Sequence, residues 1–224
     1  MVTVKMDYLA LYVTLKLALV TTALLMVGAA PVAYVLAYTR FPGKSLVEAL
    51  IYLPMALPPT VIGFYLIILM GPKGWIGGVW QTFTGGSLLF TFLGITIASI
   101  IYSIPFAIQP MKAAFAKIDR RLLESAIILG LSKRATFLRV IIPNSLGGIA
   151  AAAVLVFLHS MGAFGVLLMV GGSIPGETKV ASIAIYEAVE MMNYQAAGMI
   201  ALSFIPISYA FLLLINKLNE GARA

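Results

Sequence analysis

Long apolar runs separated by short polar ones constrain this chain more than any other feature. The first spans 9–38 and is interrupted only by Lys16, and others follow at 47–71, 88–109, 146–170 and 196–215. A helix needs about 20 apolar residues to cross a bilayer. Because 62% of the 224 residues are hydrophobic and only 10% are charged, a soluble core cannot account for these runs. We predict an all-α polytopic membrane protein with about five transmembrane helices, forming a single domain over 1–224.

Most of the Lys and Arg residues fall on one side of these five spans. Loops that face the cytoplasm are enriched in Lys and Arg. We therefore expect the N-terminus outside, the C-terminus and the 111–143 loop in the cytoplasm, and the chain in the cytoplasmic (inner) membrane. The eleven basic residues on that side, of fifteen, are Arg40, Lys44, Lys112, Lys117, Arg120, Arg121, Lys133, Arg134, Arg139, Lys217 and Arg223.

The same distribution excludes several function classes. The net charge of +7 follows membrane topology, and no basic patch interleaved with aromatic residues indicates nucleic acid. The chain has no cysteine, and no second His or acid stands at ligand spacing beside His159. We expect membrane lipid as surroundings, no nucleic acid partner, no metal site and no cofactor in this chain.

The 111–143 loop is predicted to form a helix-turn-helix hairpin. Asp119 is a suitable N-cap for a first helix, and Gly130 lies where a helix ends in a left-handed C-cap. Ser132 is an N-cap for a second helix, which we expect to end at Pro143 because proline has no backbone N–H. The hairpin is too polar to be buried in lipid.

This hairpin carries more apolar surface than a solvated loop should. Such a patch marks either a partner interface or a helix that lies on a lipid surface. Composition alone slightly favours the second alternative, an amphipathic hairpin on anionic lipid whose Lys and Arg residues only satisfy the positive-inside rule.

The second span contains three prolines, Pro54, Pro58 and Pro59. Prolines free backbone carbonyls, and in a membrane those groups need neighbouring helices, hydroxyls or a water-filled cavity. The span is either a broken helix that lines a pathway, with Pro58, Pro59 and Thr60 at the break, or a kinked packing helix. Sequence alone favours neither.

Polar residues in two other spans are further candidates for a pathway. Thr96, Ser99 and Ser103 share one helical face, which either lines an aqueous path or makes hydrogen bonds across a helix interface. Packing is the commoner case. His159 lies near the middle of the fourth span, and an ionisable group there is a functional candidate. A neutral imidazole hydrogen-bonded to a neighbouring helix is the favoured alternative.

The remaining connections are short. The 71–87 stretch is Gly-rich and is predicted to be an interfacial loop anchored by Trp75 and Trp80. An irregular loop is expected at 171–176, and 177–192 reads as an amphipathic helix at the membrane edge.

The hairpin holds a spaced series of an acid, small residues, aromatic and branched residues and a proline: Glu124, Ala126, Gly130, Phe137, Val140, Ile142 and Pro143. This series resembles the cytoplasmic coupling loop of ATP-binding cassette (ABC) importer permeases. The resemblance implies that the loop docks into a groove on an ATPase subunit. The residues that it marks for coupling are Glu124, Ala126, Gly130, Phe137, Ile142 and Pro143.

Three further segments, 40–44, 57–64 and 174–178, resemble the molybdate branch of these permeases, to which sulfate permeases are similar. The resemblance implies a second copy of the chain, two ATPase subunits and an extracytoplasmic oxyanion-binding protein that delivers molybdate or tungstate. It departs at Ala163, where the family usually has Glu, so no gating role is assigned there. Some relatives also carry an extra N-terminal span, for which this chain is too short.

The residues themselves limit the mechanism. Spans two to five contain no Lys or Arg, so no strong charge-assisted site for a dianion is expected inside the membrane. A catalytic role would need paired carboxylates, a Ser/His arrangement or a metal cluster, and we expect no enzyme. An ATP-independent secondary transporter would show intramembrane charges and often an inverted repeat, and we find neither. The chain has no Walker A motif, so ATP use would belong to a partner.

Overall fold

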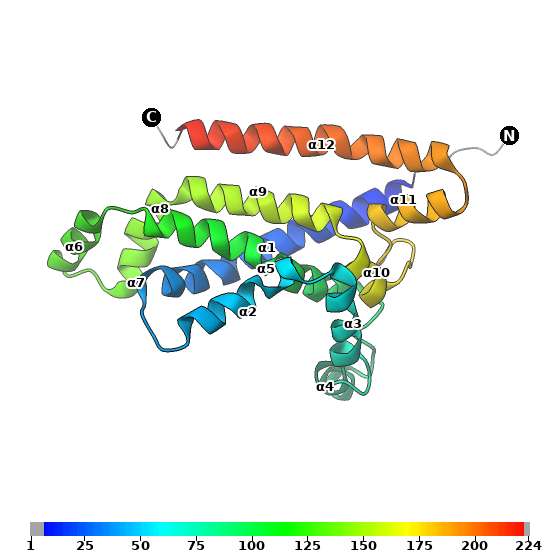
Figure 1. The fold of residues 1–224 in the computed structure, drawn as a ribbon, viewed down its shortest axis with the longest axis horizontal. Coiled ribbons are helices and arrows are strands. Elements are labelled where there is room, and N and C mark those ends of the chain that lie inside the picture. The colour runs from blue at the N-terminus through cyan, green and yellow to red at the C-terminus, as the bar shows by residue number, and fades with distance from the viewer. Residues whose placement is uncertain (1–6, 222–224) are drawn as a thin grey trace.

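The computed structural model describes residues 7–221, with side chains to residue 213 (Figure 1). The described residues are all-helical with no strand, as predicted. Arg223, assigned to the cytoplasmic side, lies outside the described residues, as does the side chain of Lys217. The helices are α1 (Tyr8–Tyr38), α2 (Lys44–Ala56), α3 (Pro59–Met70), α4 (Trp75–Thr84), α5 (Phe92–Ala116), α6 (Arg120–Ile128), α7 (Lys133–Thr136), the π-helix η1 (Phe137–Ile141), α8 (Ile142–Asn144), α9 (Leu146–Gly162), α10 (Gly165–Gly171), α11 (Ala181–Glu190) and α12 (Tyr194–Gly221).

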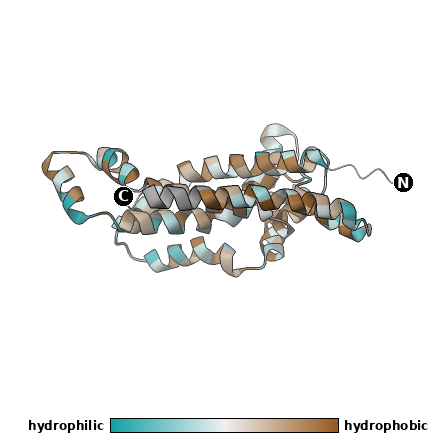
Figure 2. Cartoon of the chain, turned by 90° about the horizontal axis from the view of Figure 1, so that it is seen from above, coloured by the Kyte–Doolittle hydropathy of each residue, from teal (hydrophilic) through white to brown (hydrophobic). Residues whose placement is uncertain are grey.

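Three helices are long and apolar enough to cross a membrane: α1, α5 and the Tyr194–Leu213 part of α12. Two bent pairs bring the number to five among residues 7–221 if each pair is one span. These are α2 with α3, bent by 111°, and Lys133–Asn144 with α9, bent by 76°. Hydrophobic residues dominate the long helices, whereas hydrophilic residues gather in the hairpin and near helix ends (Figure 2). The chain is therefore a multi-pass membrane protein.

Helices α1, α5 and α9 form the centre of the bundle (Figure 1). Small residues allow their close contact: Ala33, Ala107 and Ala152 are each fully buried there. The approach is tightest at Gly148, where an added Cβ would lie 2.2 Å from the Cβ of Ala114. Small residues at the start of the fourth span therefore allow the close approach of α9 to α5.

The second expected span, 47–71, is two helices and not one. α2 ends at Ala56, α3 begins at Pro59, and the two are bent by 111°. Proline disfavours helical backbone in the residue before it, so Pro58 and Pro59 hold Leu57 and Pro58 extended, with ψ of 142° and 138°. A break caused by the prolines is therefore present, whereas Pro54 remains inside α2.

The fourth expected span, 146–170, is also interrupted. α9 ends at Gly162, the backbone is extended at Ala163, and α10 begins at Gly165. The hydroxyl of Ser182 donates a hydrogen bond of 2.7 Å to the Ala163 carbonyl, which the break removes from the helix. α10 then packs on α3. The prediction of one continuous span over 146–170 was wrong at this point. Gly162 and Gly165 flank the break, and the freed carbonyl of Ala163 accepts a hydrogen bond from a residue outside the span.

Other boundaries also differ from the predicted ones. α5 begins at Phe92 and runs to Ala116, beyond the expected 88–109, because Met111 and Phe115 are fully buried in the bundle. The 111–143 loop therefore starts after α5. α1 matches 9–38, and α12 extends past the expected 196–215 to Gly221.

The 71–87 stretch is not only a loop, because it contains α4. An added Cβ at Gly77 would lie 2.1 Å from the Met70 carbonyl oxygen, so this glycine lets α4 fold back against the end of α3. Trp75 is 90% exposed, as an interfacial anchor would be in a single copy, while Trp80 packs against the core.

The end of the bundle at which α1 begins is held by ionic contacts. Lys179, before α11, lies 2.8 Å from Glu187 and 3.4 Å from Asp7, which also caps α1. Burial would lower the pKa of Lys179, but hydrogen bonds and charge contacts with Glu187 and Asp7 outweigh it and raise this pKa. Burial likewise would raise the pKa of Glu187, and hydrogen bonds from Lys179 and Ser173 lower it overall.

Candidate functional site: the hairpin and a membrane cavity

The hairpin predicted for the 111–143 loop consists of α6 to α8, and its first half folds as the capping residues predict. The Asp119 carboxylate accepts a hydrogen bond of 2.9 Å from the backbone N–H of Arg121, so Asp119 is the N-cap of α6. After α6, Gly130 has a φ of +72°, and the N–H of Leu131 donates to the Ala126 carbonyl at 3.0 Å. This is the hydrogen bond of a left-handed helix C-cap, which favours glycine.

The second half begins as predicted but ends differently. Ser132 caps α7, with its hydroxyl accepting from Ala135 N–H at 3.2 Å. Pro143 does not end the helix, which continues to Asn144. A π-helical turn precedes the proline, and the Asn144 amide donates to the Val140 carbonyl at 2.6 Å. This side chain therefore satisfies a carbonyl near a proline that cannot donate.

The six expected coupling residues divide between two environments. Glu124, Gly130 and Pro143 are exposed, while Ala126 is buried. Phe137 and Ile142 pack against the core of the bundle. The excess apolar surface that the sequence predicts for the hairpin is exposed at the end of α6, where Ile127, Ile128 and Leu129 are 70%, 85% and 78% exposed.

Aromatic contacts tie the hairpin to the bundle. The Phe137 ring lies 5.1 Å from that of Tyr34 in α1 and 6.2 Å from that of Phe115 in α5, measured between ring centroids. The hydroxyl of Tyr38 donates to the Phe115 carbonyl at 2.5 Å. The hairpin is thus packed against the ends of both helices, so a force on it would reach α1 and α5.

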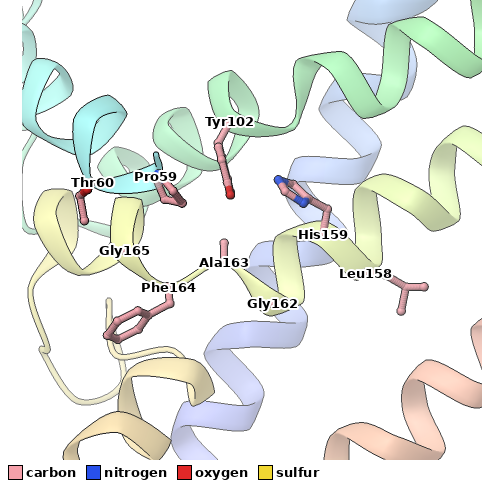
Figure 3. Close-up of a pocket in the computed structure, with 9 residues that line it drawn as sticks. All are labelled: Pro59, Thr60, Tyr102, Leu158, His159, Gly162, Ala163, Phe164 and Gly165. Carbon is pink, nitrogen blue, oxygen red and sulfur yellow. The ribbon is translucent and has the colours of Figure 1, made fainter. Parts of the chain in front are cut away.

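A cavity of about 470 Å³ lies where both broken spans meet α5 (Figure 3). It brings together three sequence-predicted residues, Pro59, Thr60 and His159, from distant parts of the chain. Pro58 immediately precedes them at the break. The lining residues are Pro59, Thr60, Tyr102, Leu158, His159, Gly162, Ala163, Phe164 and Gly165. Tyr102 and Ala163 point towards one another across this space, with His159 beside them (Figure 3).

His159 is surrounded by aromatic rings. Its ring lies 4.0 Å from that of Phe106, nearly stacked, and 4.4 Å from that of Tyr102. Its Nε2 atom is buried and has no hydrogen-bond partner among the described residues. The neighbouring helix α5 contacts the imidazole through the rings of Tyr102 and Phe106. The hydrogen bond between His159 and a neighbouring helix, which the sequence favoured, stays a prediction.

The three hydroxyls of α5 that the sequence singled out, Thr96, Ser99 and Ser103, do not belong to residues that line this cavity. Ser99 and Ser103 are fully buried, and each lies near the Ser160 hydroxyl of α9, at 3.2 and 3.3 Å. Thr96 donates to the Phe92 carbonyl within its own helix at 2.8 Å. In this structure the three hydroxyls join helices or satisfy their own, as the packing alternative describes, and their place on a pathway stays a prediction.

One ion pair between two helices was not predicted from the sequence. Glu48 in α2 and Lys112 in α5 form an ion pair with 2.6 Å between Oε1 and Nζ. An acid inside an apolar run signals a partner, but the sequence does not reveal which helix supplies it.

Together, the broken spans, the cavity between them and the projecting hairpin define a class: a helical, multi-pass membrane permease. A family comparison supports this class. Residues 29–223 match the model of the "Binding-protein-dependent transport system inner membrane component" family, and the chain belongs to that family.

Within this family the chain is similar to molybdenum and sulfate permeases, as inferred from its motifs. It is 44% identical over 204 residues to the molybdenum transport system permease protein ModB of Azotobacter vinelandii, covering 89% of this chain and 90% of that protein. It is 31% identical to ModB of Escherichia coli K12, covering 82% and 80%. The probable sulfate transport system permease protein cysT of Nephroselmis olivacea is 33% identical, with 94% and 74% covered.

A solved structure shares the fold. A chain from inward-facing conformations of the MetNI methionine ABC transporter matches with a TM-score of 0.74 at 15% identity, covering 97% of this chain and 96% of that one. At this identity the likeness concerns the fold alone.

Proposed function

We propose that this chain is the membrane-spanning subunit of an ABC importer that carries molybdate or tungstate across the cytoplasmic membrane. A separate ATPase subunit drives transport by alternating access. The observation that carries the proposal is the 44% identity to a molybdenum permease along 89% of this chain. The subunit holds no cofactor of its own, since ATP is bound by the partner.

The complete importer contains two copies of this chain, two ATPase subunits and an extracytoplasmic oxyanion-binding protein. The N-terminus lies outside and the hairpin in the cytoplasm. The exposed apolar residues Ile127, Ile128 and Leu129 at the end of α6 support a docked ATPase. An exposed apolar patch of this kind usually marks a protein–protein interface. The neighbouring Glu124 supplies a polar contact at the edge of that interface.

The route runs between the two copies and is lined by the proline break. Pro59 and Thr60 line the cavity. Pro58 and Pro59 have no N–H, so they cannot donate to the carbonyls one helical turn before them. No Lys or Arg lines this cavity. Backbone and hydroxyl groups then host a hydrated oxyanion weakly, which suits a path that the substrate must leave as easily as it enters.

A sulfate permease is the second candidate, favoured by 33% identity to a probable sulfate permease over 94% of this chain. An ATP-independent secondary transporter is less well supported. Copurification separates an ABC permease, for either oxyanion, from a secondary transporter. An ABC permease copurifies with a nucleotide-binding subunit, and a secondary transporter does not.

The decisive experiment is uptake of radioactive molybdate by the whole complex in proteoliposomes, with unlabelled tungstate and sulfate as competitors. We expect ATP-dependent uptake that tungstate blocks and a large excess of sulfate does not. Uptake of sulfate with equal efficiency would contradict the assignment of the substrate. A binding assay on the solute-binding partner then separates molybdate from tungstate.

A further inference from the structure

The inference concerns the ion pair between Glu48 of α2 and Lys112 of α5. The two charged atoms are 2.6 Å apart, and the side chains are only 23% and 27% exposed. A charge held at the edge of a membrane costs free energy unless it is paired. Apolar residues would pack there without that cost, so an ionic pair at this place indicates a function in which its geometry matters.

The pair is important for the position of α2 because this helix has little else to hold it. α2 contains no fully buried residue. Ile51 is only partly buried against the core cluster of α1, α5 and α9. Among the described residues, Glu48–Lys112 is the one ion pair of α2. The other side-chain hydrogen bond from α2 to a neighbouring helix end is exposed: Lys44 donates to the Thr39 carbonyl at the C-cap of α1, across the turn that joins the two helices.

The two residues of the ion pair lie on helices that connect to different parts of the molecule. From Lys112, α5 continues for one turn to Phe115, which contacts Phe137 of the hairpin and accepts the Tyr38 hydrogen bond. From Glu48, α2 continues to the proline break and the cavity at Pro59. The ion pair therefore joins the element that carries the hairpin to the element that carries the break.

We propose that the Glu48–Lys112 ion pair transmits movement of the hairpin to the proline break, which makes both residues positioning residues for transport. The inference rests on the proposed function, because it assumes that hairpin movement drives the route. When the hairpin shifts the end of α5, the pair carries α2 along as one body. Without the pair, the hairpin moves while α2 and the break do not follow.

The test uses the complete importer, with its ATPase subunits and binding protein, in proteoliposomes. The variants are Glu48→Gln, Lys112→Met and the charge exchange Glu48→Lys with Lys112→Glu. Lys117→Met is the matched control, because Lys117 is exposed at the end of the same helix and has no ion pair among the described residues. Molybdate uptake and ATP hydrolysis are measured on the same samples.

Each single variant should lower uptake per ATP hydrolysed by about tenfold or more, while hydrolysis itself stays within about twofold of the parent. The charge exchange should restore most of the ratio, and Lys117→Met should match the parent. An unchanged ratio in both single variants, a failed restoration, or hydrolysis that falls in parallel with uptake would each overturn the inference.

A second measurement does not depend on the substrate. The chain has no cysteine, so spin labels can be placed by Leu53→Cys on α2 and Leu122→Cys on α6, both exposed positions. In the parent background we expect the distance between the two labels of one copy to keep the same narrow distribution with and without trapped ATP. Adding Glu48→Gln should broaden it, and an unchanged distribution would overturn the inference. If the parent takes up no oxyanion while the distances behave as expected, the proposed substrate is wrong and the mechanical link stands.

Discussion

The hairpin and the membrane cavity are built in opposite ways. The hairpin is one continuous segment, and its turns are fixed by side chains within it, such as Asp119, Gly130 and Ser132. The cavity is assembled from α3, α5 and the junction of α9 with α10, which are distant in sequence. Local hydrogen bonds therefore determine the first, and packing between helices determines the second. A substitution should act locally in the hairpin and through neighbours in the cavity.

The largest expected effect follows from replacing Gly130 with Val. Gly130 has a φ of +72° with open space around it, so the cost is one of backbone conformation and not of collision. A β-branched residue in this region costs about 1–3 kcal/mol, and the second helix would be re-aimed. We expect molybdate uptake to fall by about tenfold or more and ATPase association to weaken, measured by uptake and copurification.

The control for this substitution is Gly28→Val, at a position in α1 that also has open space but has helical backbone. It should leave association unchanged. Normal association and uptake in Gly130→Val would show that the hairpin does not depend on its glycine turn.

The cavity is tested by cysteine substitution in a chain that has none. If the proline break faces water, a small water-soluble thiol reagent should label the introduced cysteines in a pattern that changes when nucleotide is trapped on the ATPase. Ile62→Cys is the control: Ile62 is buried in α3, so this cysteine should remain unlabelled. Labelling at no position in either state would place the route elsewhere. The positions are Met55, Ala56, Thr60, Val61 and Phe64.

A smaller effect is expected for Glu124→Ala. The Glu124 side chain is exposed, and within the described residues it has no ionic partner, so the loss should appear only in the complex. An exposed contact would cost about 1 kcal/mol or less, and one buried by the ATPase about 3–5 kcal/mol. The affinity between the subunits, measured at low and high salt, distinguishes an exposed contact from a buried one. Identical assembly and transport at both salt concentrations would exclude a docking role.

The smallest effect concerns the contacts of Lys179 with Asp7 and Glu187, which like the cavity join distant segments. The pKa of Glu187 is lowered by folding, so its stabilising contribution is present above its ordinary value of 4.5 and is lost as pH falls through the folded pKa. The pKa of Lys179 is raised, so its contribution is present below 10.5 and is lost as pH rises further.

Glu187→Gln should therefore lower the melting temperature near pH 7 by about 1–3 °C, with a smaller difference near pH 3.5. Glu177→Gln is the control, because Glu177 is exposed in the same region and forms no ion pair among the described residues. A difference that stays constant across this pH range would rule out an ionic origin.

The features that could be predicted are those determined by residues close together in the sequence. The caps of the hairpin, the proline break and the first long helix all follow from residues within a few positions of the feature. The interruption at Ala163 was not predicted, because Ser182, which satisfies its carbonyl, lies beyond the span. The partner of Glu48 was likewise not predictable, since Lys112 meets it only after α2 packs on α5.

The candidate site shows the same division. His159 and Thr60 were found as polar groups within apolar runs, but their meeting in one cavity depends on two helix breaks and on α5. Tyr102 and Phe164 were missed because an aromatic residue in an apolar run gives no signal of its orientation. Ser160 was missed as the common partner of Ser99 and Ser103 because the sequence does not show which face of α9 meets α5.

The contact between Gly148 and Ala114 has a consequence for how this sequence can vary. Their backbones approach so closely that even one methyl group on Gly148 would collide with the methyl of Ala114. Neither position can be enlarged alone, but a methyl moved from one to the other keeps the volume between α5 and α9. Among relatives we expect the two positions to covary, with alanine at 148 accompanied by glycine at 114.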